Sequence, residues 1–450
     1  MENGRELAGD SLPAGPVAEQ ERISSVDVLR GFALLGILVM NIGDYALPGN
    51  FDYNPSILGP LGRLNLWLWG VRFVLFEGKM RALFSMLFGA GVILLTSRLD
   101  KRGDAAISGD IFLRRNMWLT LFGILHAYLL WWGDILYFYG MTALLFLYPC
   151  RKLQAKKLLI AGVAVVLLAA GYRVVRLEQR SHLAQRAAVA RKLQAAGQTL
   201  SEGQKADVKE WQTVVEGTHP DRQELDKEIA EMRGGYASVF RHNAPEVISE
   251  QGAGFYRFGF CDSLGMMLIG MGLLQSGFLS GELSLRVYAW TALLGYAVGL
   301  PLGALSTWQV WRHNFDALSM IRWEFLPYDI QRIFVAVGNA AVVLLIVKAG
   351  ALKWATKPVA AVGQTALSNY LGTTVICVLF FDGYGLGMFG RLRFYQLFYV
   401  VAAIWVFNLV ASSIWLRYFR FGPMEWVWRS LTYWKRQPMA RESARAESTT

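Results

Sequence analysis

The stretch RISSVDVLRGFALLGILVMN (residues 22–41) decides how this chain folds. From residue 31 to residue 40 every side chain is apolar or glycine, as in a helix that crosses a lipid bilayer. Four polar residues nevertheless lie at the two ends of this run or just beyond: Asp27, Arg30, Asn41 and Asp44. Because polar groups are costly in hydrocarbon, the pattern predicts a membrane helix that faces other helices or a water-filled cavity.

The whole chain has the composition of a membrane protein. Of its 450 residues, 54% are hydrophobic and 13% are aromatic, and the mean hydropathy is +0.32, which is more apolar than a soluble enzyme of this length. The net charge is +11, and a strongly positive net charge also occurs in proteins that bind nucleic acids. Here, however, the basic residues form short clusters between apolar runs, as in cytoplasmic membrane loops, so no nucleic-acid partner is expected.

These features predict an all-α fold, a polytopic bundle of transmembrane helices. Ten segments are long and apolar enough to cross the bilayer: 29–47, 81–97, 115–132, 134–150, 157–175, 255–278, 286–305, 331–348, 359–381 and 394–416. The segment 64–76 is shorter, rich in tryptophan and interrupted by Arg72. We therefore expect it to form one further helix at the membrane interface.

The distribution of Lys and Arg predicts the orientation and the division of the chain. With ten spans and a cytoplasmic N-terminus, the most basic short loops fall on the cytoplasmic side, and so does the C-terminus. No cleavable signal peptide is expected. The predicted parts are a cytoplasmic tail 1–28, a membrane half 29–175, an extracytoplasmic helical loop 176–250 that spaces or caps the outer face, a second membrane half 251–416 and a cytoplasmic tail 417–450.

The polar residues of the opening stretch share one face of the predicted helix. Arg30 and Asn41 are eleven residues apart, which is three helical turns. Asp27 lies one turn before Arg30 and Asp44 lies one turn after Asn41, so the stripe runs the length of the span. An interfacial ion pair would explain Asp27 and Arg30 alone. The complete stripe favours a path or binding site between helices.

A second constellation is HAYLLWWGDILYFYG (residues 126–140). His126 lies inside a predicted span, and Asp134 follows the break at Gly133. A histidine oriented by a nearby carboxylate is the arrangement that a general base requires. The alternative is a hydrogen-bonded histidine of the core. We interpret His126 and Asp134 as candidate catalytic residues, with Asn41 as a candidate donor to a developing oxyanion.

Further polar residues occur near the outer ends of predicted spans. Arg81 begins the span that contains Ser85 and Gly89, whose four-residue spacing allows close helix packing. Asp262 requires a cationic partner within the membrane, for which Arg257 and Arg332 are the candidates. The remaining candidate is Asn369, for which ligand contact and interhelical hydrogen bonding are equally good interpretations. The substrate-binding candidates are thus Asp27, Arg30, Asp44, Arg81, Asp262, Arg332 and Asn369.

No metal site and no disulfide is expected. Cys150, Cys261 and Cys377 are isolated in or beside apolar runs, where cysteine usually acts as a small hydrophobic residue. The spans offer no cluster of His, Asp and Glu with the spacing of metal ligands.

Several long motifs resemble the YeiB-like family of uncharacterised bacterial inner-membrane proteins. They are residues 26–41, 77–91, 126–140, 366–371 and 421–433, and the resemblance extends over nearly all of the chain outside the loop 176–250. The first span is also distantly similar to that of transmembrane acyltransferases, including heparan-α-glucosaminide N-acetyltransferase, which share the Asp27–Arg30–Gly31 start and the Asn41 position. A second acyltransferase group has a catalytic histidine at the position of Asn41, so His126 would have to substitute for it here.

The resemblance implies a multi-pass protein of the bacterial inner membrane. It also implies transfer of an acyl group from a cytoplasmic acyl-CoA, such as acetyl-CoA, to a small-molecule or glycan acceptor outside. The alternative is a transporter or channel for a small polar or anionic solute, since intramembrane charges also mark permeation paths, although no inverted repeat is evident. A non-catalytic role in envelope assembly is the third alternative. The expected partner of the protein is the lipid bilayer, and the sequence is also compatible with association into a homo-oligomer.

Overall fold

The computed structural model describes residues 24–49, 51–59, 62–101 and 105–441. Within them the chain is helical, with one isolated bridge between Phe419 and Ala440 and no β-strand, which confirms the all-α prediction. Most of the predicted tail 1–28, including the segment in which no signal peptide was expected, lies outside the described residues, as does the end of the tail 417–450.

The first half of the chain forms the centre of the bundle and its longest helix. Its elements are α1 (Ser24–Ala46), the 3₁₀ turn η2 (Pro55–Leu58), α2 (Gly62–Leu75), α3 (Lys79–Lys101), α4 (Ala105–Leu129), α5 (Leu136–Thr142), the π-helical turn η3 (Ala143–Leu147), α6 (Tyr148–Cys150) and α7 (Ala155–Ala195). α1 lies inside the bundle, because most of its residues are buried. The exceptions are Ser24, Arg30, Phe32, Leu35 and Asp44.

The second half begins with helices that leave the bundle and return to it. Its elements are α8 (Glu202–Thr218), α9 (Arg222–Met232), α10 (Tyr236–Ser249), the π-helical segment η4 (Glu250–Gly259), α11 (Phe260–Gln275), α12 (Leu285–Arg312), α13 (Ala317–Phe325), α14 (Tyr328–Lys348), α15 (Lys353–Gln364), α16 (Ala366–Phe381), α17 (Phe394–Tyr418) and α18 (Pro423–Tyr433).

The prediction of ten spans is too high. In the described part of the chain, seven helices are long and apolar enough to cross a membrane, or eight if the bent pair α15–α16 counts as one. The two predicted spans that fail are 115–132 and 134–150. α4 carries Arg114, Arg115 and Asn116, which lower its hydropathy, and the helix over Leu136–Cys150 is too short. The chain is nevertheless a multi-pass membrane protein.

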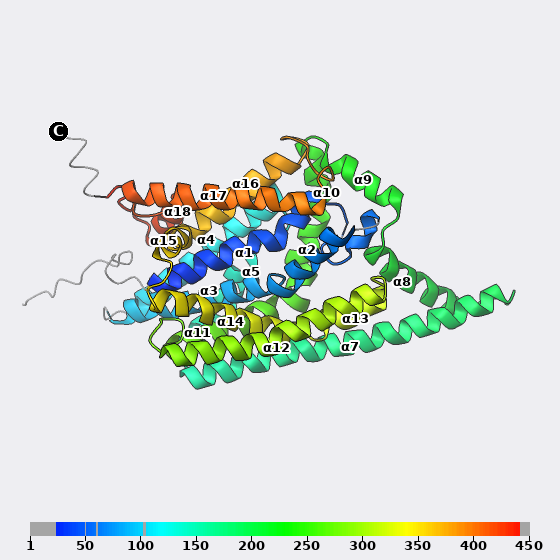
Figure 1. Cartoon of the computed structure of the whole chain (residues 1–450), viewed down its shortest axis with the longest axis horizontal. Helices are drawn as coiled ribbons and strands as arrows, with labels where there is room; N and C mark the ends of the chain where they lie inside the picture. Colours follow the sequence, from blue (N-terminus) through cyan, green and yellow to red (C-terminus); the bar gives the residue numbers. More distant parts are fainter. Residues whose placement is uncertain (1–23, 50, 60–61, 102–104, 442–450) are drawn as a thin grey trace, which may run out of the picture.

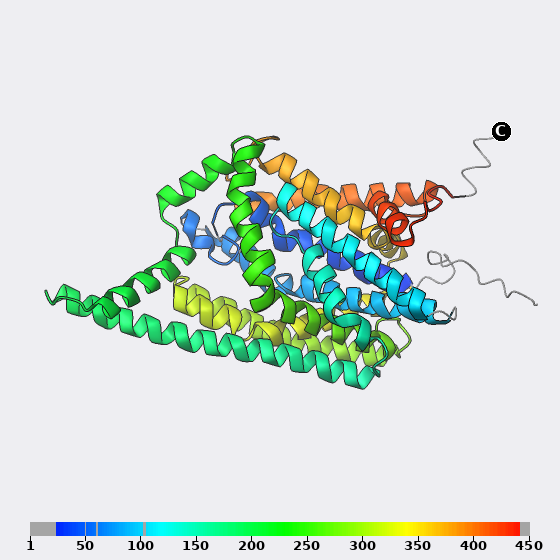
Figure 2. The ribbon, with the colours of Figure 1, turned by 180° about the vertical axis from the view of Figure 1, so that it is seen from behind.

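One end of the bundle carries the start of α1 together with α18, and the other carries the arm formed by α7, α8 and α9 (Figure 1). α7 has 41 residues, which at 1.5 Å per residue is about 60 Å, roughly twice the thickness of a bilayer's hydrocarbon core. It therefore passes through the predicted boundary at residue 175 without a break and extends beyond the bundle (Figure 2).

The segment 176–250 lies across the end of the bundle opposite the start of α1. The amide of Gly49 donates to Glu228 Oε2 at 2.8 Å, and Asn54 Nδ2 donates to the carbonyl of Thr218 at 2.8 Å. Arg233 Nε donates to the carbonyl of Phe389 at 2.7 Å. These contacts attach the segment to the loops that follow α1 and α16.

Small residues allow the central helices to touch through their backbones. A methyl group added at Gly89 of α3 would lie 2.1 Å from the carbonyl oxygen of Met267, and one at Gly270 of α11 would lie 1.9 Å from that of Met86. The small-residue spacing of Ser85 and Gly89 therefore does mark a close helix contact, between α3 and α11.

We expect Gly89→Ala to destabilise the protein by about 1–3 kcal/mol, because the new methyl group forces α3 and α11 apart. Gly91→Ala is the matched control, since nothing lies within 4 Å of the added atom in the same helix. Thermal unfolding of the purified variants in detergent measures the difference. Equal melting temperatures for the two variants would contradict the close contact.

Candidate functional site

A basic cavity of about 250 Å³ opens at the end of the bundle where α1 begins. Six charged residues line it: Asp27, Arg30, Arg98, Arg115, Glu425 and Arg429. The apolar side chains of α3 between Phe84 and Leu95 continue it toward the centre of the bundle. The cavity therefore combines a cationic opening with an apolar slot.

Two interactions hold the shape of the basic cavity. The guanidinium of Arg115 stacks on the indole of Trp428 at 3.6 Å, and Trp428 Nε1 donates to the carbonyl of Arg115 at 2.8 Å. The Glu425 carboxylate accepts from the amide of Leu367 and the hydroxyl of Ser368, each at 2.5 Å. Glu425 thus caps the first turn of α16, next to the 86° bend that separates α15 from α16.

An acidic cavity of about 570 Å³ lies toward the other end of the bundle. It brings together five predicted site residues from four parts of the sequence: Asn41, Asp44, Arg81, Asp134 and Asp262. It also contains charged residues that the sequence analysis did not select: Asp52, Glu77, Arg173, Arg176, Arg180, Glu246 and Glu250. Formal negative charge therefore exceeds positive charge among its lining residues, seven carboxylates against four guanidinium groups.

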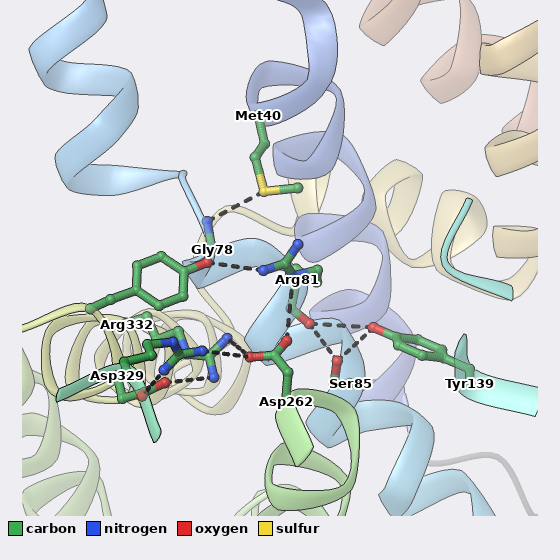
Figure 3. A network of polar contacts seen from close by, with 10 residues as sticks. Met40, Gly78, Arg81, Ser85, Tyr139, Asp262, Asp329 and Arg332 are labelled. Carbon is green, nitrogen blue, oxygen red and sulfur yellow. Dashed lines mark hydrogen bonds and ion pairs between the residues drawn. The ribbon is translucent and has the colours of Figure 1, made fainter. Parts of the chain in front are cut away.

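Asp262 is the centre of an ion-pair network in the wall of the acidic cavity (Figure 3). Its carboxylate contacts the guanidinium of Arg332, the predicted partner, and lies 3.7 Å from Arg81 Nε and 4.0 Å from Arg173 Nη2. Arg332 also binds Asp329 at 2.8 Å. The other candidate partner, Arg257, is exposed. The network joins α3, α7, α11 and α14.

Arg72 is the centre of a second network and was not recognised as a site residue from the sequence. Its side chain is fully buried and donates to the carbonyls of Met40 at 2.5 Å and Asp52 at 2.8 Å. It also pairs with the carboxylates of Asp52 at 3.1 Å and Glu77 at 3.4 Å. Burial raises the pKa of Asp52 to about 6, although the charge of Arg72 opposes the rise. An arginine inside a predicted apolar helix was the available signal.

The predicted contact between His126 and Asp134 is present, but His126 does not line either cavity. His126 Nδ1 lies 2.9 Å from Asp134 Oδ1, and Nε2 lies 3.0 Å from the hydroxyl of Thr374, which in turn bonds Tyr45 at 2.9 Å. Both ring nitrogens are thus engaged, in a side chain that is about 1% exposed. Asp134 is the member of the pair that reaches the acidic cavity.

The two predicted asparagines differ in their surroundings. Asn41 lines the acidic cavity, and its side-chain amide has no hydrogen-bond partner within the described ranges, so it is free to bind a ligand. Asn369 lines neither cavity. Its Nδ2 donates to the hydroxyls of Thr365 at 2.8 Å and Ser412 at 2.9 Å, which is interhelical hydrogen bonding.

Tyr139 lines both cavities. Its hydroxyl bonds the hydroxyl of Ser85 at 2.7 Å and donates to the carbonyl of Arg81 at 3.4 Å. The ring is buried, and it stands where α5 is followed by the π-helical turn η3. Asp27 and Arg30 lie on one side of Tyr139 and Asn41 and Asp44 on the other, so the polar stripe of α1 serves two cavities.

Among the residues that the structure describes, no group of three or more His, Cys, Asp or Glu side chains is arranged to hold a metal ion. The three cysteines are free thiols, and Cys377 is buried.

Comparison with known proteins places this arrangement in a family. The chain is 31% identical over 435 residues to the uncharacterized protein YeiB of Escherichia coli (strain K12), covering 94% of this chain and all of that protein. The chain belongs to the YeiB-like family. It is also 28% identical to the uncharacterized protein YxaH of Bacillus subtilis (strain 168), over 95% of this chain and 98% of that protein.

The C-terminal part matches a family described only as a protein of unknown function (DUF418), over residues 273–435. No solved structure matches the chain significantly. The YeiB-like relatives therefore establish common ancestry along almost the full length of the chain, and their names state no activity.

The Asp262 network makes the YeiB-like bundle sensitive to loss of one carboxylate. We expect Asp262→Asn to lower the free energy of unfolding by about 3–5 kcal/mol, because it removes the central carboxylate and leaves Arg173 and Arg332 to share Asp329. Asp110→Asn removes an exposed pair with Arg114 and should cost only about 0–1 kcal/mol. Thermal unfolding in detergent compares them, and equal losses would contradict a structural role for the network.

Proposed function

We propose that this protein is a membrane-bound acyltransferase that takes an acyl group from acyl-CoA in the basic cavity and passes it to an acceptor in the acidic cavity. The observation that carries the proposal is that the two cavities approach from opposite ends of the bundle and share Tyr139 as a wall. A donor and an acceptor held on either side of Tyr139 would have their reacting groups close together.

The basic cavity has the features that a CoA thioester requires. Arg30, Arg98, Arg115 and Arg429 provide positive charge for phosphates. From Arg98 to Phe84 the α3 wall has fourteen helical steps, which is about 21 Å. An extended arm with its phosphates at the arginines therefore places its thioester near Tyr139. Acetyl-CoA is the simplest donor of this kind.

In the acidic cavity we assign complementary roles to Asn41 and Asp134. The free amide of Asn41 donates a hydrogen bond to the oxyanion that forms when the acceptor attacks the thioester carbonyl. The acceptor oxygen or nitrogen forms a bond to the acyl carbon and gives its proton to the Asp134 carboxylate, and the carbon–sulfur bond breaks. The Asp134 carboxyl group then gives this proton to the CoA thiolate, which releases CoA and restores the carboxylate. His126 acts as a positioning residue, since it holds Asp134 through Nδ1.

The proposal includes an orientation. A cytoplasmic donor requires the basic cavity, the start of α1 and α18 to face the cytoplasm, and the arm of α7, α8 and α9 to lie outside a bacterial inner membrane. The acceptor is then a small molecule or glycan that reaches the acidic cavity from the outer side.

The first test is release of CoA from labelled acetyl-CoA by the purified protein in bacterial membrane lipid. We expect Arg115→Gln to raise the KM for acetyl-CoA about tenfold or more, which corresponds to about 1.4 kcal/mol of lost binding. Arg286→Gln removes an exposed charge of α12 that lies outside the basic cavity, and it should leave KM unchanged. Equal effects of the two substitutions on KM would show that acetyl-CoA does not bind in this cavity.

The second test concerns the acceptor side. We expect Asp134→Asn to lower kcat about a hundredfold or more, the usual contribution of a general base, while acetyl-CoA affinity stays unchanged. His126→Gln keeps a hydrogen-bonding group beside Asp134 and should lower kcat less. Asp110→Asn serves as a control for removal of a carboxylate elsewhere. Full turnover by Asp134→Asn would exclude this carboxylate as the base.

A transporter for a small polar or anionic solute is the second candidate. The observation that favours it is that α1 places polar side chains in both cavities, with Tyr139 as a barrier between them. In that case protein in liposomes moves solute without any thioester and releases no CoA. Flux that increases in Tyr139→Ala, together with absence of CoA release, would replace the acyltransferase proposal.

A further inference from the structure

The acidic cavity is lined on one side by α7 and on another by α10 and η4, and we call the part of the cavity between these helices the lateral opening. The ring of Tyr172 on α7 meets the ring of Phe258 on η4 edge-on, with centroids 5.6 Å apart. Six residues earlier in the chain, Gly252 leaves the helical conformation, with φ −91° and ψ −108°. From there α10 turns away from α7, and the two helices diverge toward the arm (Figure 2). Both helices nevertheless line the same cavity.

The two sides of this opening carry opposite charges that are not paired with each other. Arg176 and Arg180 line the cavity from α7, and Glu246 and Glu250 line it from the α10 side. Arg180 pairs at 3.7 Å with Glu210 of α8, whose side chain is exposed. Within the described ranges, no ion pair joins α7 to α10 or η4 across the gap. The opening is therefore bounded by a cationic side and an anionic side.

The surface around the opening is apolar where it would meet lipid. Leu168 and Val175 of α7 and Tyr256 of η4 are all exposed, Leu168 and Tyr256 by about 70% of their area. These residues lie on the part of each helix toward the bundle, and the charged residues lie toward the arm. A molecule entering here could leave hydrocarbon chains on the apolar surface while its polar group reaches the charges.

We propose that this lateral opening binds a zwitterionic group, with its ammonium at Glu246 and Glu250 and its phosphate or carboxylate at Arg176 and Arg180. A ligand of one sign would satisfy one side of the opening and be repelled by the other, whereas a zwitterion supplies a partner to both. A phospholipid with an amine headgroup and a free zwitterion share this chemistry. Binding is independent of catalysis, but identifying this ligand as the acyl acceptor rests on the proposed function.

Lipid retention by the purified protein tests the proposal without any thioester. The probes are dioleoyl phosphatidylethanolamine, dioleoyl phosphatidylglycerol and dioleoyl trimethylammonium propane, and native mass spectrometry counts the lipid that stays bound. We expect the zwitterionic lipid to bind about tenfold more tightly than either single-sign lipid, which is about 1.4 kcal/mol. Arg176→Gln and Glu250→Gln should each remove this preference, and Arg176→Lys should retain it.

Arg191→Gln and Glu202→Gln are the matched controls, because both residues belong to the arm and neither lines the cavity. Competition by glycerophosphoethanolamine distinguishes the sources. Displacement of the lipid shows that the headgroup alone is recognised, and lack of displacement shows that the chains contribute, each in agreement with a zwitterion site.

Equal binding of all three lipids, or an unchanged preference in both cavity variants, would overturn the proposal. CoA release without lipid preference would leave the proposed function standing and this site refuted. Lipid preference without CoA release would support this site and refute the proposed function.

Discussion

The carboxylate of Asp262 is the point on which the membrane bundle depends. Arginines from three helices, Arg81, Arg173 and Arg332, lie around it, and all three also interact with Asp329 or Tyr328. In a low-dielectric interior each of these cations is costly unless it is paired, so the network fixes the relative positions of α3, α7, α11 and α14. The wall of the acidic cavity results from this arrangement. Its polarity and its rigidity therefore have one physical origin.

Much of the candidate site follows from the sequence because intramembrane charges are rare and require partners. The stripe on α1, the pair His126–Asp134 and the pair Asp262–Arg332 were all predicted from this rule. The structure brings the members of each pair together and places the stripe along cavity walls. The periodicity of α1 also placed Asp27 and Arg30 at one end and Asn41 at the other. What periodicity could not give is that this single stripe faces two cavities.

Other features depended on tertiary structure that no local pattern shows. The sequence gives no sign that both nitrogens of His126 are taken, since Thr374 is 248 residues away. Arg72 lies in a short, tryptophan-rich segment that resembles an interfacial helix, and only the folded loop with Asp52 shows why it is buried. The charges of α7 and α10 are typical of solvated helices. Their role depends on the bend at Gly252, which a glycine alone does not predict.

Tyr139 has a consequence for the cell as well as for the site. Tyr139 is the lining residue that the two cavities share. An energised membrane carries a voltage, worth about 2.3 kcal/mol per elementary charge for each 100 mV. If the two cavities open on opposite faces of the membrane, as the proposed function requires, a conformation that moves this ring must close one cavity before the other opens, because ions would otherwise leak down the voltage.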